Sequence, residues 1–338
     1  MNARREVFAS SIRSFFHPVT AFFEDESVSE IMINGPNQIY VERRGRLELT
    51  QARFASSEKL LAALRNLSQY MGRELGPRAP ILEARLPDGA RVEAIVPPAS
   101  PHGPMVSIRR FSREPLSIDE LVALGSLPAE PAELLKGLIA EKQNIVIAGG
   151  TGSGKSSLLN ALSALMPQSA RVLVIEDTSE LRIPLPHVVY LEAQPADSRG
   201  LGAVSIRELF RASLRMRPDR VVLGEIRGAE AVELIQAMTS GHAGCLSTIH
   251  ASYPWDALHK LETMALMSDL DIPLSALRSQ IASAVDVIIQ MARLADGSRR
   301  VTHVTEVLEL GAQGAQGGYG LRSLYELGGD RSPVDDAS

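Results

Sequence analysis

Apolar residues follow two different spacings along the chain, and the change between them predicts two regions of different architecture. From residue 25 to residue 111, short runs of alternating apolar and polar residues are separated by turn sequences, and one stretch with helical spacing interrupts them. This pattern predicts a small α+β domain over 25–111. Its expected elements are strands within 28–50, 83–97 and 106–111, a helix over 58–71, and turns at 34–36, 44–45 and 87–89.

An amphipathic segment precedes this domain. Between residues 2 and 23 the apolar residues recur at helical spacing with arginines between them, and Pro18 interrupts the pattern. Because proline removes a backbone donor inside a helix, we expect a helical segment over 1–24 that breaks near Pro18. We interpret it as a helix that packs on its own domain, and docking to a partner or a membrane is the alternative.

Strands alternate with helices from residue 118 onward, which is typical of a mostly parallel sheet covered on both faces. We therefore expect an α/β domain over 118–328, joined to the first by a linker over 112–117 and followed by a disordered tail over 329–338. The last two strands should pair across a Gly/Gln-rich turn. The predicted strands are 145–147, 172–176, 221–223, 245–249, 285–292, 301–310 and 319–327, and the predicted helices are 118–124, 129–141, 156–165, 206–214, 229–238, 257–265 and 274–284.

The stretch 145–159, IVIAGGTGSGKSSLL, is the centre of the second domain. A β-branched run enters a glycine-rich turn that continues as an amphipathic helix, and the turn fits G-x-x-x-x-G-K-[ST] at every fixed position. The four glycines are expected to adopt positive φ and to turn backbone N–H groups toward phosphate oxygens. Lys155 would reach the outer phosphates, and the Ser156 hydroxyl would bind Mg²⁺. The expected nucleotide-binding residues are Gly149, Gly150, Thr151, Gly152, Ser153, Gly154, Lys155, Ser156 and Ser157.

An ordinary glycine loop before a helix is the alternative to a phosphate loop, and the strand-to-helix context disfavours it.

The composition of the chain limits the number of domains and the kinds of partner that are expected. The chain has 338 residues, 45% of them hydrophobic, which is enough for about two domains with real cores. Its net charge of −5 provides no overall positive field, so no nucleic-acid partner is expected.

The single cysteine, Cys245, excludes an intramolecular disulfide and a cysteine-rich zinc site, and it fits a reducing cytoplasmic compartment. We interpret it as strand packing. No apolar run reaches the roughly 18 to 20 residues that a spanning helix needs. Any contact with a membrane is therefore expected to go through partner proteins or a surface helix.

Acidic residues follow two of the predicted strands. The strand over 172–176 ends in Glu176 and Asp177, and the strand over 221–223 is followed by Gly224 and Glu225. Because ligands gather at the carboxyl ends of parallel strands, both acids should face the nucleotide, where a carboxylate can orient and partly deprotonate the attacking water. A solvated acidic turn or a helix cap is the alternative for Glu176.

The second acidic strand resembles a Walker B element, with Gly224 where many phosphate-loop proteins have a metal-binding Asp. We therefore expect Mg²⁺ to be held mainly by Ser156, with Glu225 acting on it through water. Arg227 would tie this carboxylate network together, and a simple surface charge is the alternative.

Two histidines frame the stretch 241–250, GHAGCLSTIH. Small residues allow close approach here, and His242 is expected to hydrogen-bond a phosphate or report its presence. Buried histidines whose role is structural are the alternative for His242 and His250. A zinc site is disfavoured because no third ligand follows at a convincing spacing.

The order GGTGSGKS, IEDTSEL, LRMRPDRVVLGEIRG and SGHAGCLSTIHA resembles the secretion ATPases of type II and type IV systems. The glutamate strand and the paired histidines correspond to that family's Asp box and His box. Further stretches look most like the branch that assembles Flp or tight-adherence pili, the CpaF type, and a conjugative-transfer ATPase is the near neighbour. These stretches are ARLPDGARVEAIVPP, VSIRRF, LETMALM and IASAVDVIIQMARLADGSRRVTHVTEV, and the whole resemblance covers about residues 25–310.

The resemblance implies a RecA-like ATPase domain that uses ATP and Mg²⁺ in a homohexameric ring. In such a ring the N-terminal domain of one subunit closes over nucleotide held by another subunit. Arg91, Arg109 and Arg110 would then be arginine fingers, although arginines that alternate along strands are also common on solvated faces. Glu176 is the expected general base and Glu225 the acid linked to Mg²⁺, and their roles are open to exchange.

The implied setting is the cytoplasmic side of the inner membrane, with peripheral attachment through platform proteins of a pilus or secretion system. Other function classes are weaker. A GTPase needs an N-K-x-D motif and an ABC transporter needs L-S-G-G-Q, and the chain has neither. A small-molecule kinase and a scaffold that binds nucleotide without hydrolysing it remain as alternatives.

Overall fold

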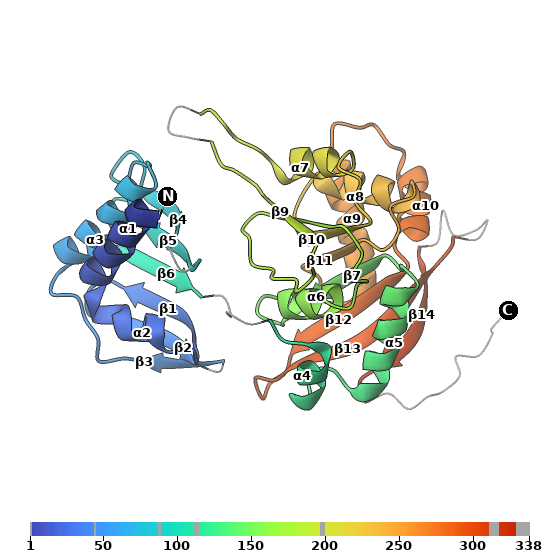
Figure 1. Ribbon diagram of the computed structural model, residues 1–338, viewed down its shortest axis with the longest axis horizontal. Helices are drawn as coiled ribbons and strands as arrows, with labels where there is room; N and C mark the ends of the chain where they lie inside the picture. Colours follow the sequence, from blue (N-terminus) through green and yellow to red (C-terminus); the bar gives the residue numbers. More distant parts are fainter. Residues whose placement is uncertain are drawn as a thin grey trace. The chain divides into compact units, whose positions relative to one another are not determined.

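The computed structural model describes residues 2–43, 45–86, 89–110, 115–196, 200–310 and 318–328 (Figure 1). The chain divides into two compact units: unit 1 contains Met1–Arg113 and Asp197–Leu201, and unit 2 contains Glu114–Ala196 and Gly202–Ser338. The chain passes from unit 1 to unit 2 between residues 113 and 114, enters unit 1 again at residue 197 and returns to unit 2 at residue 202.

Some expectations fall on residues outside the described ranges. They concern parts of the turns at 44–45 and 87–89, residues 112–114 of the linker, the Gly/Gln-rich turn and the tail. Among the described residues, no helix combines the length and apolar character required to cross a bilayer.

Unit 1 contains a six-stranded antiparallel sheet in the order β3-β2-β1-β6-β5-β4. Alternate residues of its central strands are buried, as expected for a sheet with one face on a core. The strands are β1 (Val28–Asn34), β2 (Ile39–Arg43), β3 (Arg46–Leu49), β4 (Ile81–Arg85), β5 (Arg91–Ile95) and β6 (Met105–Arg109).

The helices of unit 1 are α1 (Asn2–Phe15), α2 (Thr20–Glu24) and α3 (Ser57–Tyr70), with a 3₁₀ turn, η1 (His17–Val19), at the predicted break near Pro18. Phe8 and Ile12 of α1 are buried in the core of this unit. Ser11 Oγ lies 3.0 Å from Asn66 Oδ1 of α3. The N-terminal helix thus packs on its own domain.

Unit 2 is built on an eight-stranded sheet in the order β14-β13-β12-β7-β11-β10-β8-β9. The run from β12 to β9 is parallel, and β13 and β14 add to it antiparallel. The α/β prediction is therefore confirmed. The strands are β7 (Ile145–Gly149), β8 (Val172–Glu176), β9 (Val188–Glu192), β10 (Arg220–Ile226), β11 (Leu246–Ile249), β12 (Val287–Arg293), β13 (Arg299–Leu308) and β14 (Gly320–Glu326).

Helices cover both faces of this sheet (Figure 1). Ile145 and Ile147 of β7 join one buried cluster, and Val146 and Ala148 join the other, so β7 is buried on both sides. The first cluster includes residues of α4 (Ile118–Ala123), α5 (Ala129–Ala140) and α6 (Lys155–Ser163). The second includes residues of α7 (Ile206–Ser213), α8 (Glu230–Thr239), α9 (Pro254–Leu266) and α10 (Leu274–Ala284).

Asn144 holds the amino ends of three neighbouring strands together. Its Oδ1 accepts hydrogen bonds from the backbone N–H groups of Gly244 (2.9 Å) and Cys245 (3.0 Å), ahead of β11. Its Nδ2 donates to the carbonyl of Ala284, ahead of β12, at 2.9 Å. Fixing the amino ends sets the register of β7, β11 and β12, and with it the position of the opposite, carboxyl edge.

Candidate active site

The phosphate loop connects β7 to α6 at the carboxyl edge of the unit 2 sheet. Gly154 caps α6 in the left-handed conformation (φ 99°), and Gly152 is also left-handed (φ 70°). Backbone N–H groups at the start of a helix attract anions because they have no partner inside the helix. The loop is therefore placed to bind phosphate groups, as the motif predicts.

The expectation that all four loop glycines have positive φ is wrong for Gly149 and Gly150. Gly149 is required for a different reason. A side-chain carbon at this position would lie 2.5 Å from the carbonyl oxygen of Met291 and 2.6 Å from Ser153 Oγ. Gly150 meets neither condition, because nothing lies within 4 Å of such a carbon there.

Alanine substitutions at the adjacent residues Gly149 and Gly150 provide a matched pair of variants. Gly149→Ala is expected to destabilise unit 2 by about 1 to 3 kcal/mol, because the clash is with backbone that cannot rotate away. Gly150→Ala should change stability by less than about 0.5 kcal/mol. Chemical denaturation monitored by circular dichroism measures both, and equal effects would contradict the close approach of Met291.

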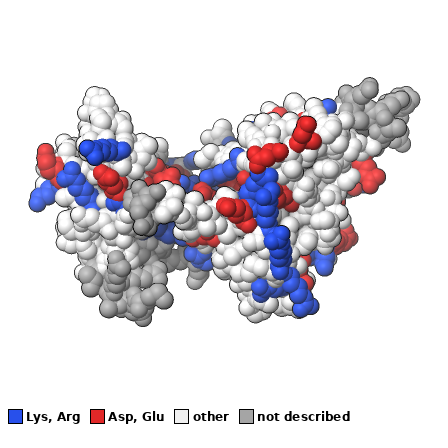
Figure 2. Space-filling view, turned by 90° about the horizontal axis from the view of Figure 1, so that it is seen from above, with Lys and Arg blue, Asp and Glu red and all other residues white. Residues whose placement is uncertain are grey.

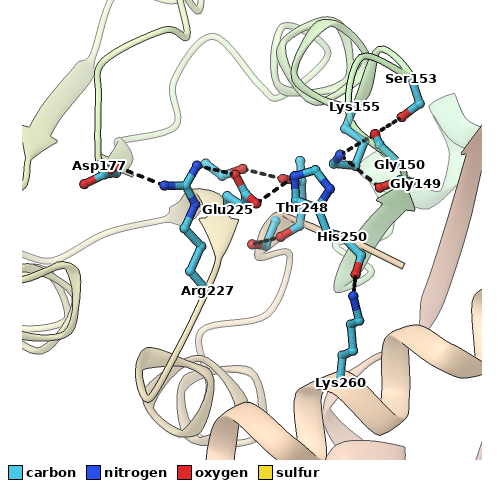
Figure 3. Close-up of polar contacts among 12 residues, drawn as sticks. Gly149, Gly150, Ser153, Lys155, Asp177, Glu225, Arg227, Thr248, His250 and Lys260 are labelled. Atoms are coloured by element: carbon cyan, nitrogen blue, oxygen red, sulfur yellow. Dashed lines mark hydrogen bonds and ion pairs between the residues drawn. The ribbon is translucent and has the colours of Figure 1, made fainter. Parts of the chain in front are cut away.

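Lys155 is buried at 7% exposure although it carries a charge. Its Nζ donates hydrogen bonds to the carbonyls of Gly149 (3.0 Å) and Gly150 (2.9 Å), as Figure 3 shows. Ser153 Oγ donates to the Gly150 carbonyl at 2.9 Å. The ammonium group is thus held against the start of the loop, beside the groups that would cradle phosphate.

Ser156, Ser157 and Thr151 are exposed at the mouth of the loop. Among the described residues, no group of three or more His, Cys, Asp or Glu side chains is arranged to hold a metal ion. Mg²⁺ bound with a nucleotide needs only one or two protein oxygens in addition to phosphates and water. An exposed hydroxyl at Ser156 fits that donor set.

Glu176 ends β8 and is 4% exposed. Its Oε1 accepts hydrogen bonds from the backbone N–H groups of Glu180 (2.9 Å) and Leu181 (3.0 Å). Burial raises the pKa of this carboxyl from its ordinary 4.5 to about 7, although the two backbone hydrogen bonds oppose the shift. An acid with a pKa near 7 is suited to exchange protons at neutral pH.

Gly224 of β10 lies directly beside Glu176. The two strands are parallel neighbours. A side-chain carbon at Gly224 would lie 2.9 Å from Glu176 Cγ, so the glutamate occupies the space that a side chain at 224 would need. This explains why the strand has glycine where a Walker B acid is common, and it brings Glu176 to the same edge as Glu225.

Glu225 lies at the centre of a chain of polar contacts (Figure 3). Its Oε1 is 3.0 Å from His250 Nε2, and its Oε2 accepts a hydrogen bond from Arg227 Nη2 at 2.9 Å. Arg227 Nη1 donates to Asp177 Oδ2 at 3.1 Å. Arg227 thus bridges the carboxylates of Glu225 and Asp177.

His250 connects this chain of contacts to the phosphate loop. Burial lowers the pKa of its imidazole, the nearby charge of Lys155 lowers it further, and Glu225 opposes both effects. Figure 3 draws the imidazole of His250 between the Glu225 carboxylate and the Lys155 side chain. A neutral imidazole is then favoured at neutral pH, and its Nε2–H can donate to Glu225.

His242 does not reach this site. It precedes β11, whose first residue, Leu246, pairs with Ile145 at the amino end of β7, whereas the phosphate loop follows the carboxyl end. Its Nδ1 is buried and has no hydrogen-bond partner among the described residues. The expected contact between His242 and a phosphate bound at this loop is therefore wrong. The strand β11 lies between His242 and His250, so the two histidines are at opposite edges of the sheet.

The three arginines expected as fingers belong to unit 1 and differ from one another. Arg91 on β5 and Arg109 on β6 are directly opposite each other in the sheet, and Arg109 is exposed. The guanidinium of Arg110 donates to the carbonyls of Phe22 and Val28, both at 3.0 Å, and also to that of Asp25. The Arg110 side chain thus binds backbone carbonyls of its own unit, which corrects its assignment as an arginine finger.

Two polar side chains that sequence reasoning missed support the flanks of the site. Thr248 Oγ1 donates to the carbonyl of Gly224 at 2.7 Å, and Gln290 Nε2 donates to the carbonyl of Ala251 at 3.1 Å. They hold the backbone next to Glu225 and next to His250. The available signal was a polar residue inside an otherwise apolar buried strand, in LSTI and VIIQM.

The parallel sheet, the phosphate loop and the acids at its edge define a phosphate-loop ATPase. The chain belongs to the family described as type II/IV secretion system proteins, which it matches over residues 15–327. It is similar to the type IV secretion system protein PtlH of Bordetella pertussis, with 34% identity over 81% of this chain and 88% of that protein. VirB11 of Bartonella quintana is 31% identical over 85% of this chain and 90% of that protein.

Solved structures show the same fold at lower identity. The ATPase DotB of Legionella pneumophila aligns with a TM-score of 0.58 at 20% identity, over 87% of this chain and 80% of that chain. The pilus retraction motor PilT with bound ADP aligns with a TM-score of 0.59 at 18% identity, over 92% and 81%. At these identities the likeness supports the fold alone.

Proposed function

We propose that this protein hydrolyses ATP with Mg²⁺ and passes the resulting conformational work to a secretion or pilus machine. The observation that carries the proposal is that Lys155, the contact between His250 and Glu225, and Glu176 all lie at the carboxyl edge of one parallel sheet. A cation for phosphate and two acids from separate strands are the parts that in-line hydrolysis requires.

The two acids have different surroundings, which supports different roles. Both oxygens of Glu225 already face cationic or polar partners, His250 and Arg227, so it suits an indirect role toward Mg²⁺ through water. Glu176 Oε2 has no hydrogen-bond partner among the described residues, and its pKa of about 7 suits a general base that accepts a proton from the attacking water. Ser156 would be the direct protein ligand of Mg²⁺, which polarises the phosphate oxygens when bound.

The active form is proposed to be a homohexamer in which Arg91 and Arg109 act on nucleotide held by the next subunit. An arginine that arrives from outside stabilises the charge that develops on the transferred phosphoryl group. The exposure of Arg109 and the position of Arg91 opposite it on the same sheet support this pairing.

The driven machine is proposed to be a Flp or tight-adherence pilus, with the ATPase on the cytoplasmic side of the inner membrane and attached through platform proteins. A conjugative-transfer or other type IV secretion role is the second candidate, since PtlH and VirB11 carry that description. Deleting the gene should remove surface pili and leave DNA transfer unchanged, and the reverse result would favour the second candidate.

No nucleic-acid partner is proposed. On the face drawn in Figure 2, Lys and Arg side chains form a row on unit 2 with Asp and Glu side chains beside them. The net charge of −5 gives the chain no overall positive field that would attract a phosphate backbone.

Steady-state phosphate release by the purified chain tests the activity. We expect release with Mg·ATP, a much smaller rate with Mg·GTP, and none after chelation of Mg²⁺. Sedimentation with and without nucleotide tests the hexamer. Tight ATP binding without phosphate release would favour the scaffold instead.

A further inference from the structure

The segment 177–187 joins β8 to β9 and contains no helix or strand. Four consecutive backbone N–H groups of this segment donate to side chains and not to a neighbouring strand. The pairs are Glu180 and Leu181 to Glu176 Oε1, Arg182 to Asn160 Oδ1 at 2.7 Å, and Ile183 to Tyr190 Oη at 2.9 Å. Side chains of β8, α6 and β9 therefore hold this segment in place.

Asn160 provides the contact from α6, the helix that begins with Lys155. It is 5% exposed, and its Nδ2 is buried without a hydrogen-bond partner among the described residues. A buried amide with an unpaired donor costs free energy. The bond that its Oδ1 accepts from the Arg182 N–H joins positions 22 residues apart in sequence. An apolar residue in place of Asn160 would avoid the cost but would lose this bond.

The position of Asn160 on α6 relates it to the nucleotide site. Asn160 lies four residues after Ser156, so the two side chains share one face of the helix. Ser156 is the expected ligand of Mg²⁺, and Lys155 precedes it. One helix thus carries the groups that would hold Mg·ATP and the group that holds the segment beside Glu176.

The same segment orients the carboxylate of Glu176. Both of its bonds to Glu176 reach one oxygen, Oε1, so the carboxylate cannot rotate without losing them. The two donors directly precede Arg182 in the chain, so the bond between Arg182 and Asn160 limits how far they can move. The orientation of Glu176 is thereby linked to α6.

We propose that Asn160 is a positioning residue, which fixes the carboxylate of Glu176 relative to nucleotide bound at the phosphate loop. It acts through the backbone of residues 180–182 and contacts neither the nucleotide nor the attacking water. This inference rests on the proposed function, in which Glu176 is the general base.

Asn160→Ala removes the acceptor and is expected to lower kcat for phosphate release by about 10- to 100-fold, because the general base is then misplaced. The Kd of fluorescent ADP should stay within about twofold of the wild-type value, because the phosphate loop is unchanged. Asn160→Asp keeps an oxygen at the position of Oδ1 and should restore most of the lost rate. Thermal unfolding verifies that each variant is folded.

Ser163→Ala is the matched control. Ser163 is a fully buried polar residue of the same helix, and its Oγ donates to the carbonyl of Leu159 at 2.7 Å. The variant therefore removes one buried hydrogen bond from α6 without touching the segment beside Glu176. It should leave kcat within about twofold of the wild-type value.

A double variant tests whether Asn160 acts through Glu176. The effects of two residues that act through one another do not add. Adding Asn160→Ala to Glu176→Gln should therefore lower the single-turnover rate by less than about twofold. A further loss of about tenfold in the Glu176→Gln background would show an independent role and contradict the inference.

The pH dependence of stability gives a readout that does not require turnover. The two N–H bonds lower the pKa of Glu176 against the effect of burial, and among nearby charges Glu180 raises this pKa and Arg182 lowers it. Loosening the two bonds in Asn160→Ala should raise the pKa further. The fall in stability with rising pH should then extend to higher pH than in the wild type, as denaturation between about pH 5 and pH 9 would measure.

An unshifted stability profile in folded Asn160→Ala would overturn the link between Asn160 and Glu176, whether or not the protein hydrolyses ATP. An unchanged kcat in this variant would also overturn the inference, as would an equal loss of kcat in Asn160→Asp. Wild-type protein that binds nucleotide but releases no phosphate would instead overturn the ATPase proposal, and the stability profile would then decide the link alone.

Discussion

Replacing Lys155 with alanine is expected to lower the rate of ATP turnover by about 10²- to 10³-fold while the chain stays folded. The ammonium group is a buried cation at the start of the loop, and its charge lowers the pKa of His250. Its removal leaves the charge on the outer phosphates without a partner in the transition state. Phosphate release under saturating Mg·ATP measures the loss.

Stability must be separated from activity in this variant. Lys155 Nζ also bonds the carbonyls of Gly149 and Gly150, so some destabilisation is expected, about 1 to 3 kcal/mol for the lost contacts. Gln168→Ala, at an exposed position beyond the end of the same helix, is the control and should retain most activity. Wild-type turnover in folded Lys155→Ala would refute the assignment of the site.

Glu176→Gln is expected to abolish most turnover and at the same time to stabilise the protein above neutral pH. The amide oxygen can still accept the hydrogen bonds from Glu180 and Leu181, so the local fold is kept. The amide cannot accept a proton from water, so a general base is lost, at a cost of about 10²- to 10⁴-fold in rate. The wild-type rate should rise with pH through about 7 as Glu176 ionises.

The stability effect follows from the direction of the pKa shift. Because burial raises the pKa of Glu176 from 4.5 to about 7, the folded state binds a proton more tightly than the unfolded state between these values. Wild-type stability therefore falls as pH rises through this window, by about 3 kcal/mol in total. Glu176→Gln lacks this loss, so its advantage in free energy of unfolding should grow between pH 4.5 and about 7 and stay constant at higher pH.

Denaturation at pH 5 and pH 8 measures the difference, with Glu309→Gln, at an exposed position, as the control. A constant difference between wild type and Glu176→Gln across this range would contradict the raised pKa. Full activity in the variant would transfer the role of general base to Glu225.

Local sequence patterns predicted secondary structure correctly where the residues of one helix, strand or loop are enough to specify it. The break of the N-terminal helix near Pro18, the strand-loop-helix of the phosphate loop and the helix over Ser57–Tyr70 follow from short-range sequence, and the structure has all three. The strand Val188–Glu192 was missed. It is the edge strand of its sheet and only half-buried, so its apolar residues show no clear alternation.

The sequence also placed the acids correctly at the carboxyl edge. Parallel strands bring their carboxyl ends to one side, so Glu176 and Glu225 needed only correct strand assignments. The same rule, applied to both ends of β11, separates His250 from His242, because the strand lies between them. Treating the two histidines as one motif hid that separation.

By itself, the sequence determined the fold class of unit 2, the phosphate loop with Lys155 and Ser156, and the family. Hydrophobic periodicity and the fixed spacing of a motif are properties of residues that are close in sequence, so they can be recognised without knowing how the rest of the chain folds. Only the tertiary structure decided that Gly224 makes room for Glu176, that Arg110 binds backbone carbonyls of its own unit, and that Asn160 bonds the segment beside Glu176. These are contacts between residues far apart in sequence, and strand order and register, which no local pattern encodes, bring them together.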